Sequence, residues 1–289
     1  MHNQFLEAVH QGKKQKSLYF LGILLILSYW LLLSGPIALV SQSILSLIVN
    51  SAKITYFIAT SFSFVFLLAL LVYVIKKIHH RNVYSLINAD AIINYKRLFT
   101  GFIIWIIQVS AFTFLDILLY PQSYTYTFEP KQWFLLLPLV LIFTPVQTSV
   151  EELLYRGYLM QGLSLITKRP VILVLVTSLV FAIPHFGNPE MQRGFVWGAL
   201  TYLVWGIFFA VITLKDGGLE LALGVHAANN IFSFLVVNTP DSVMPSPTIL
   251  TYIRPIESVE GFFSLLIQAS IFYCIFFGGI PRNPKQSRV

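Results

Sequence analysis

Three short groups of polar residues interrupt otherwise apolar stretches of this chain. They are Glu151-Glu152-Leu153-Leu154-Tyr155-Arg156, Phe181-Ala182-Ile183-Pro184-His185 and His226-Ala227-Ala228-Asn229-Asn230. A charged side chain at membrane depth costs about 2.5–3.5 kcal/mol by insertion scales, so such residues are retained where they pair with one another or serve a function. The three groups therefore mark the place where this chain is expected to do chemistry.

The first group predicts an ion pair and one additional carboxylate. On a helix, Glu152 and Arg156 lie four residues apart on one face, with the acid N-terminal to the base. Glu151 points about 100° away around the helix and has no evident partner in the sequence, so it is available to accept a proton from water. The structural alternative is a charge cluster that only holds helices together.

The other two groups supply further polar side chains. His226 and Asn230 share one helix face, and the small residues between them allow a close approach by a neighbouring helix or a substrate backbone. Taken alone, they could be an interhelical hydrogen-bonded pair, and His185 could be a packed histidine. Together the groups supply what peptide-bond hydrolysis requires: a base for the water (Glu151), a second group to orient the water (His185), and donors for the oxyanion (His226 and Asn230).

The elements that carry these residues are predicted to be transmembrane helices. Of the 289 residues, 56% are hydrophobic and 11% are charged, and the mean hydropathy is +0.75. A soluble domain has about 25% charged residues, so a soluble globule, a disordered chain and a nucleic-acid-binding domain are excluded, and no nucleic-acid partner is expected. The single cysteine, Cys274, excludes an internal disulfide.

The apolar runs predict an all-α polytopic membrane protein with about eight transmembrane helices, since a spanning helix needs about 20 apolar residues. The stretch 83–98 is too polar to span, and the helical spacing of its apolar residues predicts one interfacial amphipathic helix. The runs lie at about 18–46 (interrupted by Gly35-Pro36), 54–75, 99–120, 133–163, 171–186, 195–214, 219–237 and 261–280.

The basic residues predict the topology. Fourteen of the nineteen Lys and Arg residues fall in alternate connections that include both termini, and four fall in the others. Because cytoplasmic loops collect Lys and Arg, both termini are expected to be cytoplasmic, in a multi-pass protein of the plasma membrane. The predicted units are N-terminal helices with the interfacial helix (1–130), a core that holds the polar groups (131–240), and a last outer loop, final helix and basic cytoplasmic tail (241–289).

The motifs EExxxR, FxxxH and HxxxN, at Glu151 to Arg156, Phe181 to His185 and His226 to Asn230, resemble those of the CPBP family of CAAX proteases and bacteriocin-processing or immunity proteins, also called the Abi family. The turn Asp216-Gly217-Gly218-Leu219 resembles the glycine-rich turn of that family. The resemblance covers about residues 133–237.

The resemblance implies an eight-helix intramembrane endopeptidase whose site opens toward the cytoplasm. It implies that Glu151 activates water with the support of Glu152 and Arg156, that His185 shares the water, and that His226 and Asn230 stabilise the oxyanion. The implied partners are the lipid bilayer and a membrane-embedded or lipidated peptide or protein, either of CAAX type or a signalling or bacteriocin peptide.

Three alternatives remain open at the level of sequence. Zinc bound by Glu151, His185 and His226 is the leading chemical alternative, although the H-E-x-x-H signature is absent, and we favour catalysis without metal or other cofactor. A non-catalytic immunity or sensor-scaffold protein would use the same polar groups as a binding pocket. A transporter is less consistent with the chain, which shows no inverted repeat.

Overall fold

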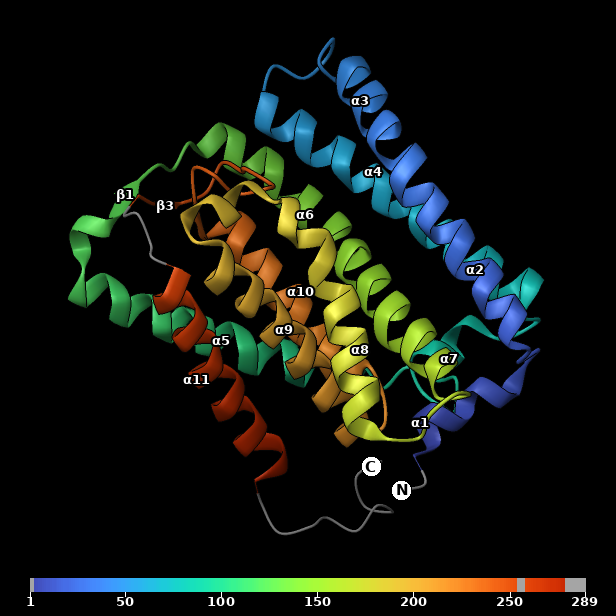
Figure 1. The fold of residues 1–289 in the computed structure, drawn as a ribbon. Coiled ribbons are helices and arrows are strands. Elements are labelled where there is room, and N and C mark those ends of the chain that lie inside the picture. Colours follow the sequence, from blue (N-terminus) through green and yellow to red (C-terminus); the bar gives the residue numbers. More distant parts are fainter. Residues whose placement is uncertain (1–2, 254–257, 279–289) are drawn as a thin grey trace.

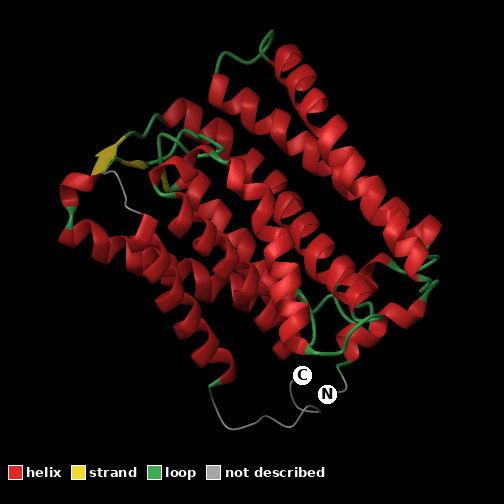
Figure 2. Cartoon of the chain, viewed as in Figure 1, coloured by secondary structure: helices red, strands yellow, loops and turns green. Residues whose placement is uncertain are grey.

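The computed structural model describes residues 3–253 and 258–278, and this part of the chain is mostly helical (Figure 1, Figure 2). The α-helices are α1 (Gln4–Glu7), α2 (Lys16–Ser28), α3 (Ser34–Leu45), α4 (Ala52–Tyr73), α5 (Tyr95–Leu119), α6 (Pro130–Glu152), α7 (Gln161–Leu163), α8 (Pro170–Ala182), α9 (Phe195–Asp216), α10 (Glu220–Leu235) and α11 (Ser258–Phe277). Turns of 3-10 helix are η1 (Ala8–Gln11), η4 (Val83–Leu86), η5 (Pro121–Ser123), η7 (Ile183–Gly187) and η8 (Pro189–Arg193). Turns of π-helix are η2 (Tyr29–Leu33), η3 (Val74–Ile78) and η6 (Leu153–Met160).

Seven helices in this part of the chain are long and apolar enough to cross a membrane. They confirm the predicted class, an all-α multi-pass membrane protein. They are Lys16–Leu45, Ala52–Ile78, Tyr95–Leu119, Pro130–Leu163, Pro170–Gly187, Phe195–Asp216 and Val259–Phe277.

The eighth predicted span, 219–237, differs from the expectation. It forms α10, which has 16 residues and is therefore about 24 Å long at 1.5 Å per residue. This is shorter than the hydrocarbon core of about 30 Å. Because α10 packs against α5, α6 and α9 and most of its residues are buried, its length is set by neighbouring helices rather than by lipid.

Close packing of α10 depends on glycine. A Cβ atom at Gly224 of α10 would overlap the carbonyl oxygen of Leu98, and one at Gly101 of α5 would overlap the carbonyl oxygen of Leu221. The two helices thus approach each other backbone to backbone, as small residues permit in membrane proteins. This contact fixes the position of α10 along α5, and α10 carries His226 and Asn230.

The Gly35-Pro36 pair, which interrupts the first apolar run, does not end the helix, because α2, η2 and α3 form one continuous helix. Pro36 has no N–H group and would clash with the carbonyl of a regular preceding turn. The π-helical turn η2 directly precedes this position and widens the helix there. The proline is therefore accommodated without ending the helix.

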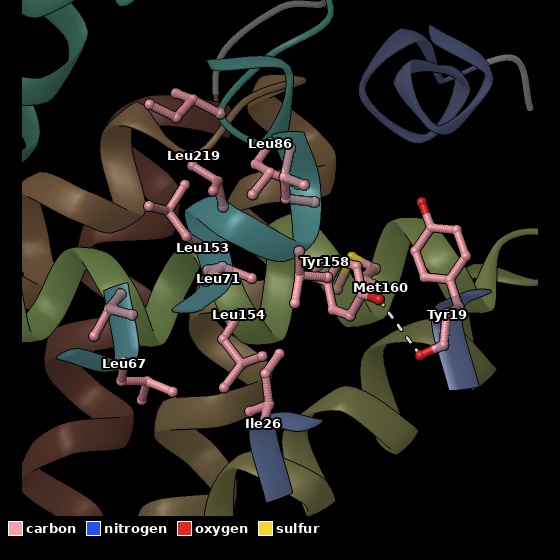
Figure 3. Packing of buried hydrophobic residues seen from close by; sticks show 14 of the residues in the cluster. Tyr19, Ile26, Leu67, Leu71, Leu86, Leu153, Leu154, Tyr158, Met160 and Leu219 are labelled. Carbon is pink, nitrogen blue, oxygen red and sulfur yellow. Dashed lines mark hydrogen bonds between the residues drawn. The ribbon is translucent and has the colours of Figure 1, made fainter. Parts of the chain in front are cut away.

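The interfacial helix predicted over 83–98 is wrong. Only η4 is helical before α5 begins, and the side chain of Asn94 caps α5 by accepting from the Arg97 N–H at 3.1 Å. Asn88 donates to Glu220 of α10 and to the carbonyl of Ile92, and Asn side chains that bond to nearby backbone favour turns over helix. Of the apolar residues that suggested a membrane-facing stripe, Leu86 (Figure 3) and Ile87 are buried in the protein core, whereas Ile92 and Tyr95 are exposed.

The core in Figure 3 joins the N-terminal helices to α6 and η6. Ile26 of α2 and Leu71 of α4 belong to the same cluster as Leu154, within the first polar motif, and Tyr158, two residues after it. The Tyr158 hydroxyl donates to the carbonyl of Tyr19 at 3.4 Å. The first polar group is therefore anchored from behind by helices that carry none of the candidate site residues.

Three short strands form a small sheet at one end of the bundle (Figure 1). They are β1 (Tyr124–Tyr126), β2 (Val237–Asn238) and β3 (Leu250–Tyr252), in the order β1-β3-β2. β1 pairs antiparallel with β3, and β2 pairs parallel with β3. We call this end of the molecule the sheet end.

At the opposite end, α1, residues 79–94, 164–169 and the turn 217–219 contact one another, and we call it the basic end. The contacts include Gln11 Nε2 to Ala89 O (2.6 Å), Lys168 Nζ to Glu7 Oε1 (2.8 Å) and Leu219 N to Ile87 O (2.8 Å). Contacts at the sheet end include Ser51 Oγ to Gln132 Oε1 (2.9 Å), Thr127 N to Ile249 O (3.0 Å) and Val243 N to Glu190 Oε2 (3.1 Å). Successive connections between the long helices thus lie at alternate ends of the molecule, as the distribution of Lys and Arg residues predicts. Arg254, Arg282, Lys285 and Arg288 lie outside the described residues.

Candidate active site

The first polar motif forms the predicted ion pair at the junction of α6 and η6. Arg156 Nη1 lies 3.0 Å from Glu152 Oε1, and both side chains are fully buried. Arg156 Nη2 also donates to the carbonyl of Gly206 on α9 at 3.0 Å. The guanidinium lies over the rings of Phe181 and Phe209, 4.6 and 5.2 Å from their centroids. Arg156 is thus held by α6, α8 and α9 together.

His226 lies between the two glutamates. Its Nδ1 is 2.9 Å from Glu152 Oε1, and its Nε2 is 3.8 Å from Glu151 Oε2. The imidazole stacks on Phe209, with ring centroids 4.8 Å apart and planes inclined by 22°. Glu151 therefore has a neighbour that its sequence context did not reveal, and Glu152 positions the His226 ring from behind.

His185 is not on a regular helix but in the 3-10 turn η7 that continues α8. Its Nδ1 lies 2.9 Å from the carbonyl oxygen of Phe181. A carbonyl only accepts, so Nδ1 carries the proton and Nε2 of the neutral ring is an acceptor. The ring stacks on Tyr202 at 4.2 Å between centroids, and the Tyr202 hydroxyl donates to Glu190 Oε1 at 2.6 Å. These contacts fix both the orientation and the tautomer of His185.

Asn230 lies one helical turn after His226 on α10. Its side-chain oxygen accepts from Asn229 Nδ2 at 3.2 Å, and Asn229 Oδ1 accepts from the indole of the buried Trp105 at 3.4 Å. The amide group of Asn230 keeps its two donor hydrogens for other partners. Asn229 and Trp105 therefore act on Asn230 by positioning it.

One cavity of about 410 Å³ joins these residues. Glu151, His185, His226 and Asn230 line it, whereas Glu152 and Arg156 are buried behind them. The structure thus brings all six predicted residues into one region but divides them into four that face the cavity and two that support it.

The cavity is reached from the sheet end. Its lining includes Asn188, Arg193, Asn238, Ser242 and Gly261, which belong to or lead into the loops at that end, and no residue of the basic end. The side that carries most of the described Lys and Arg residues is therefore not the side from which the cavity opens. In the orientation that the charges predict, the cavity would open on the side opposite the cytoplasm, so the expected cytoplasmic opening stays a prediction that requires the reverse orientation.

Two loops are linked over this cavity. Arg193, the last residue of η8, forms an ion pair with Asp241. Glu190 Oε2 accepts from the Val243 N–H at 3.1 Å, while Glu190 Oε1 accepts from Tyr202 and Asn188. Chain segments about fifty positions apart thus form a common rim.

Sequence reasoning missed several polar residues of the cavity. Gln147 lies four residues before Glu151 on α6 and lines the cavity beside it, so helical spacing from Glu151 was a usable signal. Tyr202 and Glu190 carried no such signal, because their role depends on the fold of η7 and η8. All three are candidate positioning or binding residues.

The ligand set considered for zinc was tested against this geometry. Among the described residues, no three His, Cys, Asp or Glu side chains form a group that could hold a metal ion. In this arrangement Glu151, His185 and His226 are therefore not grouped around one position that a metal ion could occupy.

Comparison with known proteins identifies the region that holds the site. Residues 130–232 match the family of Rce1-like type II CAAX prenyl endopeptidases, and all six motif residues fall in this range. The chain is 35% identical over 185 residues to "Uncharacterized protein YyaK" of Bacillus subtilis (strain 168), an alignment that covers 63% of this chain and 62% of that protein. The chain is thus matched to less than two thirds of that relative's length, and no solved structure matches the chain. Residues 130–232 are therefore similar to the Rce1-like family, in agreement with the resemblance of the three motifs to the CPBP or Abi group.

Proposed function

We propose that this protein is an intramembrane endopeptidase that hydrolyses a peptide bond of a membrane-associated substrate with water activated by Glu151. The observation that carries the proposal is the single cavity lined by Glu151, His185, His226 and Asn230. The walls of this cavity, which opens at the sheet end, carry a carboxylate, an acceptor nitrogen and two side chains that can donate hydrogen bonds. This is the set of groups that hydrolysis by water requires.

In the proposed reaction, Glu151 removes a proton from a water molecule that also donates to Nε2 of His185. The hydroxide attacks the carbonyl carbon of the scissile bond, and charge develops on the carbonyl oxygen. Asn230 donates an N–H to this oxyanion, and His226 donates from Nε2 when its ring is protonated. Glu151 then transfers the proton to the leaving nitrogen.

The proposed reaction uses a protonated His226, and the charges around it complement that form. Glu151 and Glu152 carry two negative charges, and Arg156 balances one of them. A cationic His226, within 3.8 Å of one carboxylate and 2.9 Å of the other, balances the second. Buried charges are tolerated when they are paired, so the site is consistent with a neutral group of four ions.

The Rce1-like family match favours a peptide substrate. A lipidated peptide of CAAX type and a signalling or bacteriocin peptide are both compatible with the cavity. A non-catalytic immunity or scaffold protein would bind a peptide in the same space without cleaving it, which the following experiment separates from hydrolysis.

The purified protein in lipid nanodiscs is incubated with a random decapeptide library in water enriched in ¹⁸O. We expect new peptide termini, with ¹⁸O in the newly formed carboxyl groups, in mass spectra of the products. Peptides that are retained by the protein but recovered intact would contradict the protease proposal and support a binding function.

Metal-independent catalysis predicts that chelators leave cleavage of this library unchanged. We also expect Asn230→Ala to lower the cleavage rate about 10²- to 10³-fold, as the loss of one oxyanion donor does elsewhere. Elemental analysis of the purified protein provides the second measurement. One zinc per chain, lost together with activity in His185→Ala, would overturn the metal-free mechanism and leave the protease proposal intact.

The proposed orientation places both termini in the cytoplasm and the protein in the plasma membrane, because the basic end carries most of the described Lys and Arg residues. Reporter domains fused before α2 and after Arg282 should both report the cytoplasm. A reporter inserted after Ser51, at the sheet end, is the matched control and should report the opposite side. If the fusions at the termini report the outside and the insertion after Ser51 reports the cytoplasm, the cavity mouth faces the cytoplasm.

A further inference from the structure

We infer that the free edge of strand β2 binds the substrate, by pairing with an extended segment of the peptide close to the bond that is cleaved. This inference rests on the proposed function and specifies how the same cavity holds its substrate. β2 is suited to this role because it is an edge strand and also a wall of the cavity. Edge strands present unpaired backbone groups that readily accept a further strand.

The register of the sheet shows which backbone groups are available. Leu250 N–H donates to the carbonyl of Val236 at 2.9 Å, and Val237 is opposite Leu250 in the parallel pair. In a parallel ladder, the N–H and C=O of such a residue bond to the two residues that flank its opposite residue, and the opposite residue itself makes no hydrogen bond across that pair. The N–H and C=O of Val237 therefore point away from β3.

The free edge of β2 lies close enough to the candidate catalytic residues for one extended peptide to reach both. Val237 and Asn238 line the same cavity as Glu151 and His226. Val237 follows Asn230 by seven residues, mostly along α10, which corresponds to about 10 Å. An extended peptide rises about 3.3 Å per residue. Counted from Asn230, roughly three substrate residues therefore separate the paired position from the scissile bond. Counted from His226, the separation is about five residues.

Local contacts keep this edge rigid. The Asn238 amide donates to the carbonyl of Met244 at 3.0 Å and to Ser246 Oγ at 2.8 Å, while its oxygen accepts from the Thr239 N–H at 2.7 Å. The Asn238 side chain is therefore occupied in holding the loop and is not available to select a substrate side chain. Recognition at this edge would depend on the substrate backbone.

The chemical consequence is a preference for substrates that are extended and carry a free backbone N–H at one position near the scissile bond. Proline or an N-methylated residue at that position cannot donate to the Val237 carbonyl. Such a requirement is independent of side-chain identity and of any lipid on the substrate.

The first test uses decapeptide libraries flanked by a fluorophore and a quencher, each with one N-methylated position. We expect a single position three to five residues from the cleaved bond where N-methylation lowers kcat/KM about tenfold or more, since a backbone donor is lost and the strand pairing is blocked. The neighbouring positions, whose N–H groups point away from β2, should change kcat/KM less than threefold. Cleavage that responds equally to every N-methylated position would overturn strand pairing and leave the protease proposal standing.

The second test does not require cleavage. In a Cys274→Ser, Glu151→Gln background, Val237→Cys is compared with Tyr126→Cys on β1, the opposite edge of the same sheet, which does not line the cavity. Decapeptides whose one cysteine is a mixed disulfide with a small aromatic thiol should exchange, with release of that thiol, at position 237 at least tenfold faster than at position 126, although Tyr126 is 69% exposed. Selective crosslinking in a protein whose wild type never cleaves peptides would refute the proposed hydrolysis but support binding at β2. Equal rates at the two positions would refute binding at β2.

Discussion

Replacement of Glu151 by glutamine is expected to abolish peptide cleavage while the protein stays folded. The amide has nearly the same shape as the carboxylate, but it cannot accept the proton of the attacking water. General bases contribute about 10²- to 10⁴-fold to rates, and in this scheme the same group also returns the proton to the leaving nitrogen. The measurement is cleavage of the random decapeptide library by equal amounts of purified protein.

The matched control is Glu129→Gln, the same change at the exposed residue that precedes α6. It should leave the rate unchanged, and both variants should elute as the wild type does in size-exclusion chromatography. Because Glu151 faces the cavity, its glutamine variant should still bind peptides. A fully active Glu151→Gln protein would remove the base from the mechanism.

Arg156→Ala should lower both stability and activity. The substitution leaves Glu152 fully buried without its cation, and removal of one partner of a buried pair costs about 3–5 kcal/mol. Activity falls as well because Glu152 positions His226 through the contact to Nδ1. Thermal unfolding in detergent, measured beside peptide cleavage, tests both effects.

A double variant distinguishes charge imbalance from lost packing. Glu152→Gln combined with Arg156→Met removes both charges and keeps most of the volume, so it should unfold at a higher temperature than Arg156→Ala alone. It should remain less active than the wild type, because a neutral amide is a weaker acceptor than the Glu152 carboxylate for the Nδ1–H group of His226. Recovery of activity together with stability would show that Arg156 has no role beyond support of the fold.

The sequence predicts the local part of the site well. Glu152 and Arg156 lie four residues apart on one helix, and spacing alone was enough to pair them. The contact between His226 and Glu152 joins residues 74 positions apart, and only the packing of α10 against α6 creates it. The family motifs indicated that the two groups act together but not that His226 lies between the two glutamates.

The errors of the sequence reading also have physical causes. Hydropathy measures composition, so it could not distinguish a lipid-facing span from α10, which is short and enclosed by protein. In 83–98 the apolar periodicity was real, but Asn88 and Asn94 bond to nearby backbone and Leu86 packs inward. The position of the cavity mouth depends on η7 and η8, and these short 3-10 turns have no periodicity to detect.

The opening of the cavity at the sheet end has a practical consequence for inhibition. In the proposed orientation in the plasma membrane, the mouth rimmed by Arg193 and Asp241 would face the exterior of the cell. A peptide-like inhibitor would then reach Glu151 without crossing the lipid bilayer, so poor membrane permeability would not limit its potency on intact cells. Export pumps and cytoplasmic peptidases would likewise have no access to it before it binds.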